Sequence, residues 1–185
     1  MTPNRFYRIL VLSYAISTFA EGIIGPIYAI FVQKIGGDIL EATGAVATFL
    51  IVSGIATMII HRSSWSQKHR KLLMVLGWFI WVLGIAMYLV IADVFTLFMA
   101  QVLIALGNAT ANPAFDAELD DHTDAKIKSY EWGIFEALQD ILSGIAAIFG
   151  GLIATFFGFE VLIYFMIASA TLSFVLILYY MNMRK

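Results

Sequence analysis

Three carboxylic acids lie inside long apolar runs of this sequence, namely Glu21, Glu136 and Asp140, and no Lys or Arg accompanies them there. A carboxylate in the middle of a bilayer costs at least ~2.5 kcal/mol, so it should face a protein interior or a watery cavity. Such a group can carry a proton or bind sodium or a cationic or polyhydroxylated solute. The alternative is a protonated acid that only holds helices together through hydrogen bonds.

Together with these acids, polar side chains recur at steps of three or four residues in the first, fourth and fifth apolar runs. Each set would share one face of a helix. We predict that these faces bind a substrate or ion. They comprise Tyr14, Ser17, Glu21 and Tyr28 in the first run, Gln101, Asn108 and Asn112 in the fourth, and Glu136, Gln139 and Asp140 in the fifth. The amide side chains can bind solute hydroxyls, or they can make interhelical bonds alone, and both interpretations stay open.

The elements that position these residues are membrane-spanning helices. The chain is 61% hydrophobic and 13% charged, and its mean hydropathy is +0.88. These values predict an all-α, polytopic integral membrane protein with one domain over residues 1–185. Six apolar runs are each long enough to cross a bilayer, and we expect spans at roughly 9–32, 42–61, 72–92, 95–114, 132–157 and 160–182.

Several functional classes are excluded by residues that the sequence lacks. There is no Cys, which excludes disulfides and thiolate chemistry. The slightly acidic balance argues against nucleic acid as a partner. No catalytic Ser/His/Asp set, metal-ligand spacing or phosphate-binding loop occurs at membrane depth. We therefore expect a protein that is not an enzyme and that needs no cofactor or metal.

Basic residues indicate the orientation in the membrane. In a six-span arrangement Lys34 alone falls on one side, and all other Lys and Arg residues fall on the opposite side. By the positive-inside rule both termini are then cytoplasmic. We expect the cytoplasmic membrane of a prokaryote, and two copies in one membrane should be parallel.

Two prolines suggest a weak internal repeat. Gly25 and Pro26 occur late in the first span, and Pro113 occurs late in the fourth, so that Glu21 aligns with Asn108. The first span runs outward and the fourth inward, which predicts two inverted units of three helices, a pattern found in transporters. The alternative is a chance coincidence of two prolines near helix ends. We assign Gly25, Pro26 and Pro113 as hinge residues.

Charged stretches flank the spans on the side predicted to be cytoplasmic. We expect the acidic stretch Asp116–Asp124 to be a solvated loop, in preference to a divalent-metal site. It could form salt links with the basic stretch His61–Lys71. Arg70, Lys71 and Asp116 would then act as a cytoplasmic gate.

Four stretches resemble the major facilitator superfamily, in particular its N-terminal half. EGIIGPIYAIFVQKIGG is similar to the first helix of that family, RSSWSQKHRKLLMVLG to its loop between helices two and three, LIALGNATANPAF to its fourth helix and LSGIAAIFGGLIATFFGF to its fifth. In other places the sequence departs from the family. Ser66-Gln67 replace an Asp-Arg pair, Gln101 replaces an arginine, and Ala146-Ala147 replace a Gly-Pro pair, so the motifs do not imply arginine-linked proton coupling.

The resemblance implies a secondary transporter of a small solute that works by alternating access, with helices one, two, four and five around the cavity. Six helices correspond to one half of such a transporter, so we expect a parallel homodimer, or otherwise a heteromeric partner, in the lipid bilayer. Two rivals stay open: a non-transporting scaffold or regulatory subunit that keeps the half-fold, and an oligomeric channel.

Overall fold

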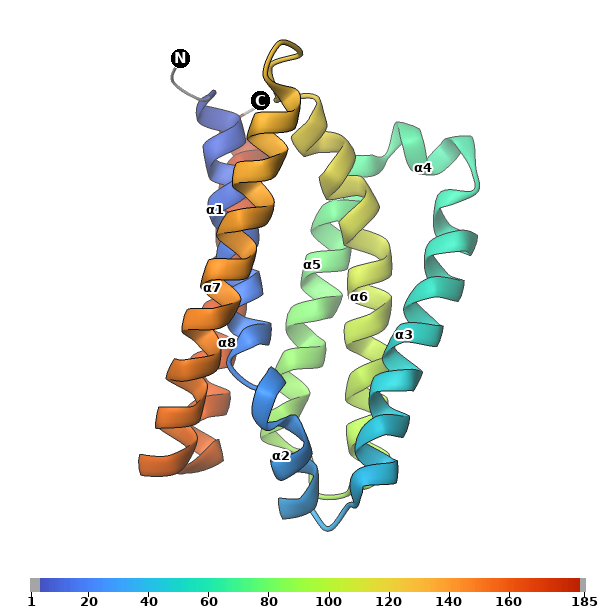
Figure 1. Cartoon of the computed structure of the whole chain (residues 1–185). Helices are drawn as coiled ribbons and strands as arrows, with labels where there is room; N and C mark the ends of the chain where they lie inside the picture. Colours follow the sequence, from blue (N-terminus) through green and yellow to red (C-terminus); the bar gives the residue numbers. More distant parts are fainter. Residues whose placement is uncertain (1–3, 184–185) are drawn as a thin grey trace. The chain divides into compact units, whose positions relative to one another are not determined.

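The computed structural model describes residues 4–183, which form helices joined by short turns and contain no strand (Figure 1). Six helical segments in this part are long and apolar enough to cross a membrane, which confirms the predicted all-α fold and number of spans. Arg184 and Lys185, part of the predicted charge bias, lie outside the described residues. The helices are α1 (Arg5–Gly22), η1 (Gly25–Ile27), α2 (Tyr28–Lys34), α3 (Ile39–His61), α4 (Ser64–Lys68), α5 (Arg70–Ala86), η2 (Met87–Leu89), α6 (Val94–Asp120), α7 (Lys128–Phe156) and α8 (Gly158–Met183).

The turns between spans follow the local chemistry that the sequence indicated. Asp38 caps α3 in a reciprocal pair with Glu41, so two backbone N–H groups at this helix start are satisfied. Gly36 and Gly158 have φ of +87° and +83°, a conformation that favours glycine, and they end α2 and begin α8.

Asp93 plays the corresponding capping role before α6. Its carboxylate accepts hydrogen bonds from the backbone N–H of Thr96 at 2.8 Å and from the Thr96 hydroxyl at 2.9 Å. These bonds favour the ionised form and hold the pKa of Asp93 below its usual value.

The fourth membrane span, helix α6, continues further than the sequence suggested. Helix α6 ends at Asp120, so Asp116 lies in the helix, and the prediction of a loop over Asp116–Asp124 is wrong for its first half. Phe115, Glu118 and Leu119 are fully buried at helical spacing, and burial of this face holds the chain helical through its acidic residues. Only the second half of the acidic stretch belongs to the turn before α7.

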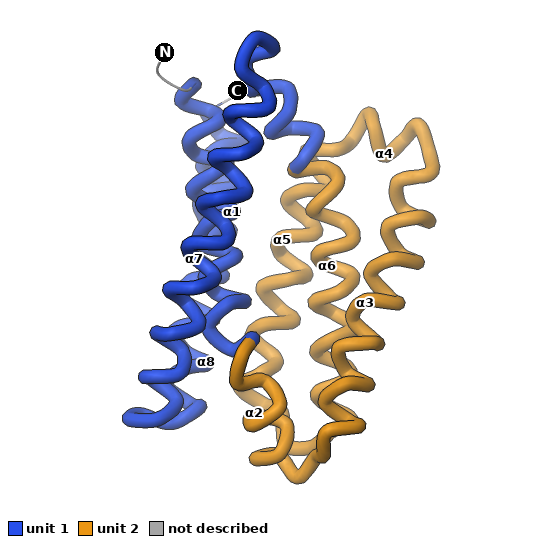
Figure 2. The backbone as a smooth tube through the Cα atoms, viewed as in Figure 1, with its two compact units in different colours: residues 1–25, 116–185 blue, residues 26–115 orange. Residues whose placement is uncertain are grey.

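Contacts divide the chain into two compact units, coloured separately in Figure 2. Unit 1 comprises residues 1–25 and 116–185, and unit 2 comprises residues 26–115. The boundaries cut the first span next to Pro26 and the fourth span just after Pro113. The single domain over residues 1–185 stays a prediction.

Unit 1 packs α1 against α7 and α8 through small residues. A Cβ atom added at Gly150 would lie 1.9 Å from the carbonyl oxygen of Ile23, so the two backbones are as close as glycine allows. The Ser173 hydroxyl donates to the Ser13 carbonyl oxygen at 2.7 Å and links α8 to α1. The Arg5 guanidinium donates to the Tyr179 hydroxyl at 3.0 Å, so the described ends of the chain lie together.

Unit 2 holds α5 and α6 in similarly close contact. A Cβ atom at Gly107 would lie 2.5 Å from the Trp81 backbone nitrogen, and one at Gly77 would lie 2.5 Å from that of Ala111. By contrast, α3 has only two buried residues, Ala42 and Ala45. The other elements of unit 2 therefore leave most of the apolar surface of this helix uncovered.

Candidate functional site

On the polar face of α1, two of the predicted binding residues make contacts within the protein. The Ser17 hydroxyl donates to the Tyr14 carbonyl oxygen at 2.7 Å, one turn earlier in the same helix. The Tyr14 ring packs on Phe135 of α7, with 5.2 Å between ring centroids. Glu21 is exposed near the end of this helix. The role of Glu21 in solute binding stays a prediction.

A contact between α1 and α7 adds a residue that the sequence reasoning missed. The Thr18 hydroxyl donates to the side-chain oxygen of Gln139. The Gln139 amide nitrogen is buried and has no hydrogen-bond partner among the described residues. A buried donor without a partner is costly, so this amide is a natural contact for an acceptor atom. Thr18 lies four residues after Tyr14 and three before Glu21, so the helical spacing could have identified it.

The two acids of α7 lie on its exposed side. Glu136 and Asp140 are exposed, and so are Ile141, Ile145 and Ile148, which follow them along the helix. An exposed carboxylate within an apolar face is expensive in lipid. This face of α7 therefore calls for water or a protein partner in addition to the elements of unit 1.

In unit 2, two of the predicted binding residues contact each other. The Gln101 amide nitrogen donates to the Tyr28 hydroxyl at 2.9 Å and to the Tyr88 hydroxyl at 3.0 Å. Both N–H donors of this buried amide are thereby used, and α6 is tied to α2 and η2. Tyr88 was also missed, because it lies in an apolar run where the sequence shows no other polar residue nearby.

Asn108 and Asn112 lie on α6 and are both half-buried. Together with Gln101 and Tyr28 they belong to unit 2, whereas the three acids and Gln139 belong to unit 1. The predicted binding residues thus form two sets, one in each compact unit.

The predicted hinge residues differ in local structure. At Gly25 and Pro26 the first span leaves the α-helix for a 3-10 turn before α2 begins. Pro113 instead lies inside α6, which continues past it. Proline removes a helical N–H donor in both places, but only the first interrupts the helix.

The predicted gate residues are also distributed over both units. Arg70 and Lys71 begin α5 in unit 2, and Asp116 lies near the end of α6 in unit 1. Their pairing stays a prediction.

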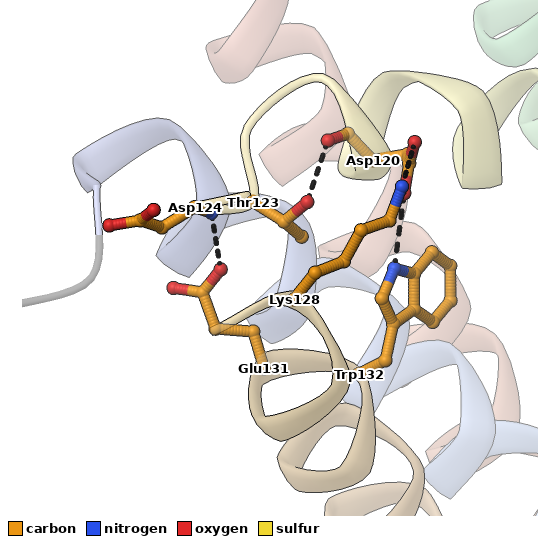
Figure 3. A network of polar contacts seen from close by, with 6 residues as sticks. All are labelled: Asp120, Thr123, Asp124, Lys128, Glu131 and Trp132. Atoms are coloured by element: carbon orange, nitrogen blue, oxygen red, sulfur yellow. Dashed lines mark hydrogen bonds and ion pairs between the residues drawn. The ribbon is translucent and has the colours of Figure 1, made fainter. Parts of the chain in front are cut away.

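The turn between α6 and α7 is held by a polar network of its own, shown in Figure 3. The Lys128 ammonium donates to the Asp120 carboxylate at 2.7 Å, and the Trp132 indole N–H donates to the same group at 3.2 Å. The Glu131 carboxylate accepts the Asp124 backbone N–H at 2.7 Å. These bonds hold Asp120 and the backbone of Asp124 against the start of α7. Within residues 4–183, no group of three or more His, Asp or Glu side chains is arranged to hold a metal ion.

Comparison with known proteins gives one finding on the family. The sequence model described as Major Facilitator Superfamily matches residues 10–185, nearly the whole chain. No curated protein matches the chain. Members of this family are generally membrane transporters and not enzymes. With six helices in residues 4–183 that are long and apolar enough to span a membrane, this chain belongs to the Major Facilitator Superfamily, a family of membrane transporters.

Proposed function

We propose that this protein is a secondary transporter of a small solute, and that Glu21 and Asp140 compensate the charge of a proton or a cationic solute. The observation that carries the proposal is the position of the two acids within unit 1. Both carboxylates are exposed within apolar spans, on helices α1 and α7 that contact each other through Thr18 and Gln139. A charge at such a depth is rare unless it serves an ion or substrate path.

Alternating access needs two helical bundles that rock about a site at the membrane midplane. We propose that a second copy of this chain supplies the second bundle, as a parallel dimer about an axis normal to the membrane. The exposed faces of α3 and α7 support this arrangement. In particular, α3 exposes Leu40, Met58 and Ile59 by 77%, 76% and 71%.

The proposal requires a water-filled cavity along the polar face of α7. Cysteine labelling tests for this cavity directly, because the natural chain has no Cys. We expect Asp140→Cys and Ser143→Cys to react with a polar, membrane-impermeant thiol reagent. Leu172→Cys is the matched control, since Leu172 is 51% exposed on the apolar helix α8 and should face lipid. If Asp140→Cys and Leu172→Cys were equally unreactive, the cavity around α7 would be disproved.

Oligomeric state tests the second bundle. Mass spectrometry of the protein released from lipid nanodiscs should give twice the chain mass. A stable monomer would contradict the homodimer, and a complex with a different polypeptide would favour the heteromeric arrangement. Saturable solute uptake into proteoliposomes would support a transporter, whereas a steady ungated ion current would favour a channel.

A non-transporting scaffold is the second candidate, and one observation favours it. Gln101 uses both of its amide hydrogens on Tyr28 and Tyr88, as expected of a residue that holds helices together. A scaffold predicts a dry interior, so that labelling fails at all polar positions tested. The same labelling series therefore separates the two functions.

A further inference from the structure

Three side chains from separate segments of unit 1 form a buried hydrogen-bonded chain. The Tyr180 hydroxyl, on α8, donates to the Glu118 carboxylate on α6 and lies 3.0 Å from His122 Nε2 in the following turn. Glu118 and Tyr180 are fully buried, and His122 is 8% exposed. Phe6 of α1 closes the chain on one side, with its ring centroid 5.5 Å from that of His122 and 6.0 Å from that of Tyr180.

The hydroxyl of Tyr180, the middle residue, sets the direction of hydrogen-bond donation along this series of three side chains. A tyrosine hydroxyl has one hydrogen to donate and oxygen lone pairs that accept. Since that hydrogen goes to Glu118, the oxygen accepts from His122 Nε2–H. If Nε2 passes its proton to the hydroxyl oxygen while the hydroxyl proton passes to the carboxylate, imidazolium and carboxylate become neutral imidazole and carboxylic acid. Both hydrogen bonds persist in the new arrangement, and one proton has moved from the ring to the acid.

The histidine end of the chain opens on a cavity. A pocket of about 410 Å³ is lined by His122 together with residues of α1, the α6–α7 turn and α7. Its acidic residues favour a high local concentration of protons. The ionisable residues that line this pocket with His122 are Tyr7 on α1, Asp121 and Asp124 in the turn, and Tyr130 and Glu131 on α7.

We propose that His122, Tyr180 and Glu118 form a proton-binding site, loaded from this pocket, that holds one exchangeable proton in the interior of unit 1. As the site of a coupling proton, this assignment rests on the proposed transport function. The proton binding itself does not, because the three groups and the pocket lie within one compact unit and need neither a solute nor a second copy. The hydrogen bond between Tyr180 and Glu118 also links α8 to α6. A change in the protonation of the site therefore changes the contact between these two helices.

Solid-state NMR of the protein in lipid bilayers tests the site without transport. With ¹⁵N-labelled histidine in a His61→Gln, His69→Gln background, His122 is the only labelled ring, and its titration can be followed with pH. The Glu118→Gln variant keeps an oxygen that accepts from Tyr180 but removes the negative charge. We expect the His122 titration midpoint to fall by about one pH unit in this variant, as for coupled groups.

Two further measurements make the result decisive. Glu160→Gln removes an exposed carboxylate from the start of α8 and should leave the midpoint unchanged, as should Tyr179→Phe on the neighbouring tyrosine. In the unsubstituted chain, the ¹³C carboxyl signal of Glu118 should change over the same pH range as the His122 ring, which keeps the test open even if Glu118→Gln fails to fold. Independent titration of His122 and Glu118, or an unchanged midpoint in folded Glu118→Gln, would overturn the proposal.

Discussion

Replacing Gly150 with alanine should destabilise unit 1, because α1 and α7 touch at this point through their backbones. The added Cβ would lie 1.9 Å from the Ile23 carbonyl oxygen, 2.7 Å from its carbonyl carbon and 3.0 Å from its Cα. All three atoms are backbone, so no side-chain rotation relieves the overlap, and the helices must separate. Overpacking of this kind costs about 1–3 kcal/mol.

The adjacent residue provides a matched control. Gly151 has no neighbouring atom within 4 Å of an added Cβ. Alanine is a better helix former than glycine by up to about 1 kcal/mol, so Gly151→Ala should be neutral or slightly stabilising. The two variants have the same composition and differ by one position, which isolates the contact with Ile23.

The measurement is the midpoint of thermal unfolding in mild detergent or bicelles, followed by loss of helical circular dichroism. A loss of 1–3 kcal/mol corresponds to a decrease of roughly 2–12 °C for a chain of this size. Equal midpoints for Gly150→Ala and Gly151→Ala would refute the close approach of α1 and α7.

Three further perturbations have defined outcomes. Asp93→Asn should lower stability at neutral pH but not in strong acid. The lowered pKa of Asp93 contributes stability that is fully present above the ordinary value of 3.8 and is lost as pH falls through the folded-state pKa. Unfolding midpoints of both proteins across pH check this. Gln101→Leu and Tyr88→Phe should show a coupling of about 0.6 kcal/mol in a double-mutant cycle of unfolding free energies, with additivity as the contrary result. Asp140→Asn should remove the pH dependence of solute uptake into proteoliposomes, and an unchanged pH profile would exclude its role in proton coupling.

The fold was largely readable from the sequence because the bilayer imposes strong constraints. Six apolar runs and their charged breaks predicted six spans, and residues 4–183 contain six helices of sufficient length and hydropathy. Errors occurred where packing overrides composition. The run Asp116–Asp120 contains three acids, yet it stays helical since Phe115, Glu118 and Leu119 are buried together.

The candidate site was only partly readable, because helical spacing identifies a face but not the partners of that face. The spacing grouped Tyr14, Ser17 and Glu21, but it could not show that the Ser17 hydroxyl bonds to its own helix. It could not link Gln101 to Tyr88 either, since that contact joins different elements. The contacts identify Gln101 as a residue that holds helical segments together, whereas the binding role of Glu21 stays a prediction.

The two prolines show most clearly what local sequence leaves undecided. Pro26 and Pro113 looked equivalent, each late in a span and each preceded by a poor helix former. Around Pro113, however, Gly77 lets α5 approach the Ala111 backbone, and Trp78 packs on Phe115 with 5.3 Å between ring centroids. This packing on both sides of the proline holds α6 helical despite the lost hydrogen bond. At Gly25 an added Cβ would meet nothing within 4 Å, so a glycine without close neighbours at its Cα precedes Pro26, and the first span leaves the α-helix there for a 3-10 turn.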